Sequence, residues 1–71
     1  MTPKRKVRIN ASVRRMLTQT TKLNEALWSL KEVLGEAGCD SESAVNDCVF
    51  SISKAVTILR GHIDKDIEAH A

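Results

Sequence analysis

The sequence predicts an all-α fold, a long antiparallel helical hairpin that forms a homodimeric four-helix bundle. Apolar residues recur with heptad spacing in two segments, the only proline is Pro3, and a turn containing Gly38 separates the segments. Seventy-one residues make one domain at most. Because two helices alone bury little apolar surface, we expect a second copy of the chain to complete the core.

The first helix is expected over about residues 10–37. Its apolar stripe alternates steps of three and four residues, the spacing of a helix face that packs against other helices. The stripe comprises Val13, Met16, Thr20, Leu23, Leu27, Leu30, Leu34 and Ala37, of which only Thr20 is polar. Gly38 follows as the left-handed residue that commonly ends a helix.

The second helix is expected over about residues 41–69. Asp40 or Ser41 is placed to cap it, and Glu42 suits the positive end of its dipole. The apolar stripe of this helix comprises Val45, Val49, Ile52, Val56, Leu59 and Ile63. The connection is about three residues long, so the two helices must be antiparallel neighbours.

The short connection also predicts the register of the hairpin. Leu30 is expected opposite Cys48 or Val49, and Trp28 is expected opposite Phe50. Trp28 and Phe50 are the only aromatic residues, and both flank the main stripes. They are therefore candidate partner-binding residues, and the alternative is ordinary packing in the dimer core.

The charge is divided unevenly along the chain. Residues 1–15 hold six basic residues and no acidic one, whereas residues 16–71 hold five basic and nine acidic residues. The candidate nucleic-acid-binding residues are Lys4, Arg5, Lys6, Arg8, Arg14 and Arg15. Residues 1–9 are interpreted as a basic N-terminal arm, whose contacts with DNA or RNA phosphates would weaken steeply with salt. The arm holds no aromatic residue, so stacking on single-stranded bases is not supported.

Two other interpretations of the basic residues stay open. The arm can be a solvated end without a ligand. The register also places Asp64 near Arg14, and Asp66 and Glu68 near the start of the first helix, so an acidic tail can neutralise part of the basic cluster.

Two conformations are considered for residues 3–9. In "KVRIN", Val7 and Ile9 alternate with polar residues, and a short strand of this pattern before two helices resembles a ribbon-helix-helix DNA-binding dimer. The stretch "GCDSESAV" resembles the loop before the second helix of that fold, although the first helix here is about twice the usual length. Alternatively, Thr2 caps a helix that has Pro3 at its first position.

Features of catalytic and metal sites are weak in this sequence. It has no tyrosine, no glycine-rich phosphate loop and no nucleophile motif, so we expect neither an enzyme nor a cofactor. His62, Asp66 and His70 share a helix face, but we interpret them as a solvated tail and expect no metal. Cys39 is interpreted as an exposed thiol, and Cys48 is interpreted as a small packed hydrophobic residue.

Two cysteines without a CxxC motif and the absence of a long apolar run indicate a cytoplasmic protein that does not span a membrane. The expected function is that of a small, dimeric regulatory protein that contacts nucleic acid through its basic arm. The alternative is a protein-binding adaptor or inhibitor, of the kind carried by phages or mobile elements. This alternative would act through a helix face and the Trp28/Phe50 flank.

Overall fold

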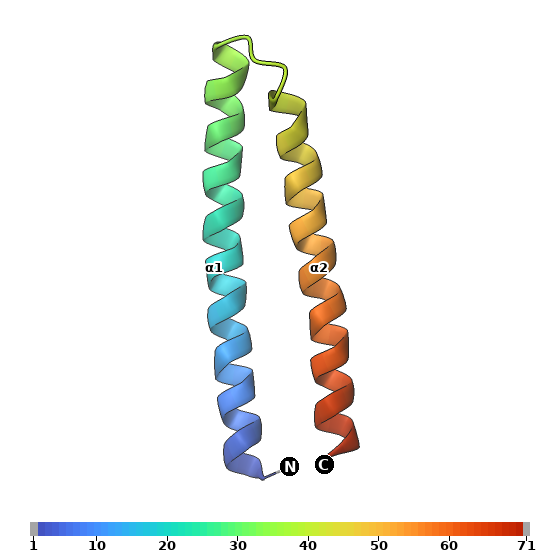
Figure 1. Cartoon of the computed structure of the whole chain (residues 1–71). Helices are drawn as coiled ribbons and strands as arrows, with labels where there is room; N and C mark the ends of the chain where they lie inside the picture. Colours follow the sequence, from blue (N-terminus) through green and yellow to red (C-terminus); the bar gives the residue numbers. More distant parts are fainter. Residues whose placement is uncertain (1, 71) are drawn as a thin grey trace.

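The structure, a computed structural model, describes residues 2–70. Two helices, α1 (Pro3–Glu36) and α2 (Glu42–Ala69), run antiparallel side by side and are joined by a short turn (Figure 1). The Cα atoms extend over 53 × 17 × 7 Å, the dimensions of a single layer of two helices. The predicted all-α hairpin is therefore confirmed. Within the described residues, neither helix combines the length and apolarity that crossing a membrane requires.

The first helix begins at Pro3, although the heptad pattern predicted a start near residue 10. The Thr2 hydroxyl oxygen accepts a hydrogen bond from the backbone N–H of Arg5 at 3.3 Å. Pro3 occupies the first helical position, where a backbone N–H has no partner within the helix. Residues 3–9 are thus the first turns of α1. They form neither a strand nor a separate arm. The strand on which the resemblance to the ribbon-helix-helix fold depended is therefore helical in this structure.

The end of α1 is a Schellman motif, in which Gly38 adopts a left-handed φ of 73°. Its N–H donates to the carbonyl of Gly35 at 3.1 Å, and the N–H of Cys39 donates to the carbonyl of Leu34 at 2.9 Å. The predicted glycine end of the first helix is confirmed. Gly38 is the one glycine with a positive φ among the described residues, so this turn has a conformational requirement for glycine.

The start of α2 agrees with the sequence within one residue, because the helix begins at Glu42. Ser41 precedes it, but the Ser41 side chain makes no capping hydrogen bond. The hydroxyl of Ser43 donates instead to the backbone carbonyl of Asp40 at 3.2 Å. The carboxylate of Glu42 lies in the first turn, where the helix dipole favours negative charge.

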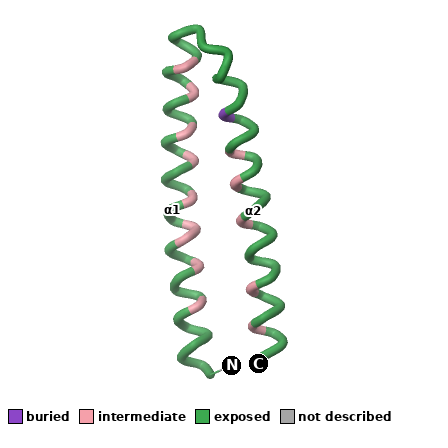
Figure 2. The backbone as a smooth tube through the Cα atoms, viewed as in Figure 1, coloured by how far each residue is buried: buried purple, intermediate pink, exposed green. Residues whose placement is uncertain are grey.

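The two helices contact each other along one side of each, shown by the half-buried positions in Figure 2. On α1 these inward residues are Ile9, Val13, Met16, Leu17, Thr20, Asn24, Leu27, Lys31 and Leu34. On α2 they are Val45, Val49, Ile52, Val56, Ile63 and Ile67. Within residues 2–70 only Val45 is buried, at 6% exposure. Within the described residues the hairpin therefore has no enclosed core. It has a line of half-buried, mainly apolar residues between α1 and α2, which we call the seam.

The orientation of α1 differs from the predicted stripe. Leu23 and Leu30 were expected to face the partner helix, yet each is 47% exposed. The residues that follow them, Asn24 and Lys31, are the inward ones, and the buried Oδ1 atom of Asn24 has no hydrogen-bond partner. On α2, Leu59 is likewise 46% exposed. The apolar stripe on α1 is wider than the contact with one neighbour, so the hairpin covers only one edge of it, whereas on α2 only Leu59 of the predicted stripe lies outside the contact.

The register is confirmed to within one residue. The Nζ atom of Lys31 donates a hydrogen bond to Oδ1 of Asn46 at 3.1 Å, whereas the predicted register places Lys31 opposite Asp47. Cys48 was expected to pack as a small hydrophobic residue, and this prediction is wrong for the hairpin because Cys48 is exposed. It lies on the uncovered edge of α2, one residue before the inward Val49.

Candidate nucleic-acid interface

The six basic residues predicted to bind nucleic acid all lie on the N-terminal half of α1, and all are exposed. Successive helical residues are about 100° apart, so residues four or seven positions apart nearly align. Lys4, Arg8 and Arg15 consequently share one side of α1. Lys22 lies seven residues after Arg15 and continues the row. We call Lys4, Arg8, Arg15 and Lys22 the basic stripe.

The helix places the other three predicted residues elsewhere. Lys6 lies about 160° around the helix from Lys4, on the side that faces α2. Arg14 lies about 100° from Arg15. Arg5 is at the edge of the basic stripe, where it lines a shallow surface hollow together with Arg8 and two uncharged residues, Ile9 and Ser12.

No acidic residue lies on α1 within the length of the basic stripe. The first turn of α1 holds no acidic residue, and the first carboxylate in the sequence belongs to Glu25. The backbone dipole adds positive partial charge at this helix end, where a cationic side chain is unfavourable by about 0.3–1 kcal/mol at low salt. The cations thus reduce the stability of α1 in the free protein, and they favour the binding of an anion at this end.

Carboxylates of α2 lie at the same end of the hairpin (Figure 1). Asp64, Asp66 and Glu68 are all exposed. Within residues 2–70, no arginine of α1 donates a hydrogen bond to any of them. Neutralisation of part of the basic cluster by these carboxylates therefore stays a prediction that rests on their being at the same end of the hairpin.

Trp28 and Phe50 lie on one broad face of the hairpin. Each follows an inward residue, Leu27 on α1 and Val49 on α2. The Nζ atom of Lys31 lies 5.1 Å from the centre of the Trp28 ring and also bonds Asn46, which follows the inward Val45. Residues that follow inward positions therefore share a face across the two helices, which we call the Trp28 face.

Trp28 is 47% exposed and Phe50 is 70% exposed. The sequence placed them opposite each other, and both lie on this face. The contact that the structure gives for the Trp28 ring is a cation–π interaction with Lys31. Glu25 and Glu32 flank Trp28 at spacings of three and four residues on the same helix side. The Trp28 face is thus mainly polar, with two large apolar side chains on it.

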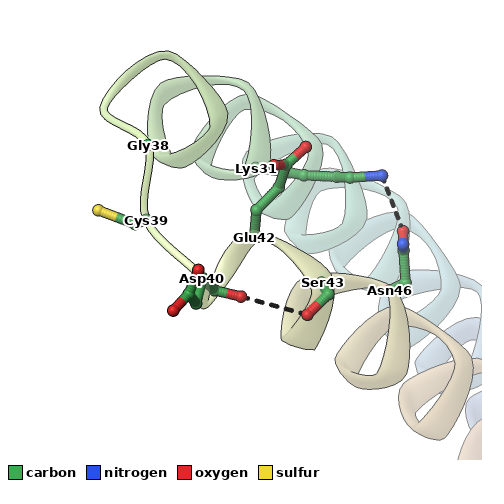
Figure 3. A pocket seen from close by; sticks show the side chains of 7 residues that line it. All are labelled: Lys31, Gly38, Cys39, Asp40, Glu42, Ser43 and Asn46. Atoms are coloured by element: carbon green, nitrogen blue, oxygen red, sulfur yellow. Dashed lines mark hydrogen bonds between the residues drawn. The ribbon is translucent and has the colours of Figure 1, made fainter.

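A second hollow lies beside the turn between the helices (Figure 3). Its lining residues are Lys31, Gly38, Cys39, Asp40, Glu42, Ser43 and Asn46. The drawn hydrogen bonds join Lys31 to Asn46 and Ser43 to Asp40, and the Cys39 sulfur points away from the hollow. The first of these bonds joins α1 to α2, and the second holds the start of α2 against the turn.

The part of the chain that the structure describes brings no three His, Cys, Asp or Glu side chains together in a way that could hold a metal ion. Cys39 and Cys48 are both free and exposed. Cys39 lies in the turn, as the sequence indicated, and His62, Asp66 and His70 are exposed near the end of α2.

The chain matches no protein-family model, no curated protein and no solved structure.

The sequence interpretation missed Lys22, because it counted basic residues only up to position 15. The spacing of Lys22 from Arg8 and Arg15 is the signal that could have found it, provided that α1 was recognised as continuous from Pro3.

Proposed function

We propose that this protein is a small, non-enzymatic regulatory protein that acts as a homodimer and contacts nucleic acid through the basic stripe. The observation that carries the proposal is the alignment of four exposed cations along one side of α1, with no carboxylate between Lys4 and Lys22. At 1.5 Å per residue the stripe is about 27 Å long. Such a row suits the regularly spaced phosphates of a nucleic-acid backbone.

A double-stranded ligand fits the stripe better than a single strand. The stripe contains no aromatic side chain on which unpaired bases could stack. It lies on a continuous α-helix, an element that the major groove of DNA admits. Lysine and arginine contacts with phosphates are insensitive to sequence, so we expect affinity for duplexes in general before any preference among them.

The dimeric state is supported by the thinness of the hairpin. A single layer of two helices, with one buried residue among those described, leaves most of its apolar side chains in contact with water. Two such hairpins packed face to face would make a four-helix bundle with a shared core. The basic stripe lies on the side of α1 away from the seam between α1 and α2.

The test is a fluorescence-anisotropy titration with a labelled random-sequence duplex at about 50 and 200 mM salt. Four phosphate contacts per chain predict an affinity that falls by about a hundredfold over this range. The double variant Arg8→Gln/Arg15→Gln should lose at least about tenfold in affinity at the lower salt concentration.

The matched control is Lys6→Gln/Arg14→Gln, which removes the same charge from outside the stripe and should change affinity by less than about threefold. Equal losses in both variants would show that net charge acts without the stripe. No binding of the unmodified protein at the lower salt concentration would contradict the proposed function. That result would favour a protein-binding adaptor that uses the exposed Trp28 and Phe50.

A further inference from the structure

A second broad face of the hairpin lies opposite the Trp28 face and is apolar over its turn-proximal part. Leu23 and Leu30 each precede an inward residue of α1, and Cys48 and Ala55 each precede an inward residue of α2. Leu59 is four residues after Ala55 and extends the same side. We call these five residues the apolar face.

Residues of the apolar face share one side of the hairpin because of their position relative to the inward residues. Lys31 reaches Trp28 and Asn46 together, so residues that follow inward positions project to one side of the hairpin. Residues that precede inward positions must then project to the other side. All five positions of the apolar face lack charge, and its three leucines are 46–47% exposed.

We propose that the apolar face is covered by a second copy of this chain, with α1 of one copy lying over α2 of the other. The proposal rests on the dimer of the proposed function and goes beyond it by naming the face and the orientation. In this arrangement each helix has only antiparallel neighbours, as in an up-down four-helix bundle.

The accessible surface of the hairpin exceeds that of a compact chain of the same mass by enough for one interface with a second copy. The hairpin has an accessible surface of 5623 Å². A compact folded chain of 7.9 kDa is expected to expose about 4,400 Å². The excess of about 1,200 Å² is sufficient for the roughly 800 Å² that each partner contributes to a standard protein interface.

The shape of the apolar face is self-complementary. The residues on α1 are large, Leu23 and Leu30, whereas those on α2 include the small Cys48 and Ala55. Leu30 lies level with Cys48, and Leu23 lies level with Ala55, within the one-residue uncertainty of the register given by the Lys31–Asn46 bond. A two-fold axis that lies between the two copies and runs parallel to the helices places a second hairpin on the apolar face. Leu23 and Leu30 of one copy then meet Ala55 and Cys48 of the other copy at the same level.

The other face-to-face orientation places α1 over α1 and α2 over α2. Leucines would then oppose leucines, and cysteine and alanine would oppose one another across a gap. Interiors pack most densely where large side chains meet small ones. The arrangement with the two-fold axis parallel to the helices is therefore the orientation that the side-chain sizes favour.

Sedimentation velocity of paired variants tests the face. Leu30→Lys places a charge on the apolar face, and Phe50→Lys makes the matched change on the Trp28 face. The unmodified protein and the Phe50→Lys variant should sediment with twice the chain mass of 7.9 kDa, and Leu30→Lys should sediment with the single mass. If Phe50→Lys dissociates the dimer and Leu30→Lys does not, the inference is wrong while the dimer stands.

Disulfide cross-linking tests the orientation without depending on how Leu30→Lys folds. In the Cys39→Ser/Leu30→Cys variant, mild oxidation should link the new thiol to Cys48 of the second copy and give a dimer band on a non-reducing gel. The Cys39→Ser control keeps only Cys48, which lies across the bundle diagonal from its counterpart, and should stay monomeric on the gel.

A dimer band from the control, or no dimer band from a Leu30→Cys variant whose two thiols both remain free to alkylation, would overturn the orientation. The duplex titration is independent of both measurements. A monomeric protein that binds duplex would contradict this inference and leave the nucleic-acid interface standing, whereas a dimer without duplex binding would do the reverse.

Discussion

The two ends of the hairpin differ in what their residues do. At the turn end, the Schellman motif, the buried Val45 and the Lys31–Asn46 hydrogen bond hold α1 and α2 together. At the terminal end, α1 carries cations beside its positive dipole end, and the described residues form no side-chain hydrogen bond between the helices. Interactions that stabilise the hairpin are thus concentrated away from the candidate binding surface.

This separation has a physical basis. A row of like charges is unfavourable for the helix that carries it, so the stabilising contacts must come from elsewhere in the molecule. Substitutions near the turn should therefore change stability much more than equivalent substitutions near the termini.

The largest loss of stability is expected at one of two valines. Val45→Ala removes two methyl groups from the most buried position and should lower the free energy of unfolding by about 1.5–2.5 kcal/mol. Val7→Ala, at a position that is 66% exposed, should change it by less than about 0.5 kcal/mol. Urea unfolding followed by circular dichroism, at one protein concentration, measures both. Equal effects would contradict the comparison.

Two glycines should respond with opposite signs. Gly38→Ala forces a side chain into a left-handed conformation and should destabilise the protein by about 1–2 kcal/mol. Gly61 lies inside α2, where an added Cβ meets nothing within 4 Å, so Gly61→Ala should stabilise by about 0.5–1 kcal/mol. Thermal melts of the two variants provide the measurement. A stabilised Gly38→Ala variant would show that the turn does not need its glycine.

The smallest difference is expected between the two helix starts. Here the substitution near the termini should cost more stability than the one near the turn. The Thr2 side chain caps α1, so Thr2→Ala should cost about 0.5–1 kcal/mol. Ser41 makes no such bond, and Ser41→Ala should have an effect below about 0.3 kcal/mol. The same urea titration resolves the two values if the variants are compared pairwise. A larger loss from Ser41→Ala would indicate a capping bond at α2.

Much of the fold could be predicted because strong local signals mark it. Gly38 and the short polar turn define the hairpin, and Thr2 with Pro3 is a recognisable start for α1 once the strand alternative is set aside. Helix spacing alone then gives the seam on α2, where five of the six predicted stripe residues face inward.

The rotation of α1 could not be predicted in the same way. Its apolar stripe is wide enough for two neighbours, and nothing local to the sequence decides which edge the nearer helix covers. Asn24 and Lys31 consequently face α2 in place of Leu23 and Leu30. The basic stripe was only partly predicted for a related reason, since grouping charges by position along the chain ignores which side of a helix they occupy.

The antiparallel path has a consequence for how the hairpin opens. Contacts near Gly38 join residues close in sequence, whereas contacts near Ile9 and Ile67 close a loop of nearly the whole chain and carry the highest loop entropy. Opening therefore begins at the termini and advances toward the turn, and backbone amides there should exchange with solvent first. The basic stripe begins in this fraying zone, so an anion bound to it would favour the helical state of the first turns of α1 and slow amide exchange there.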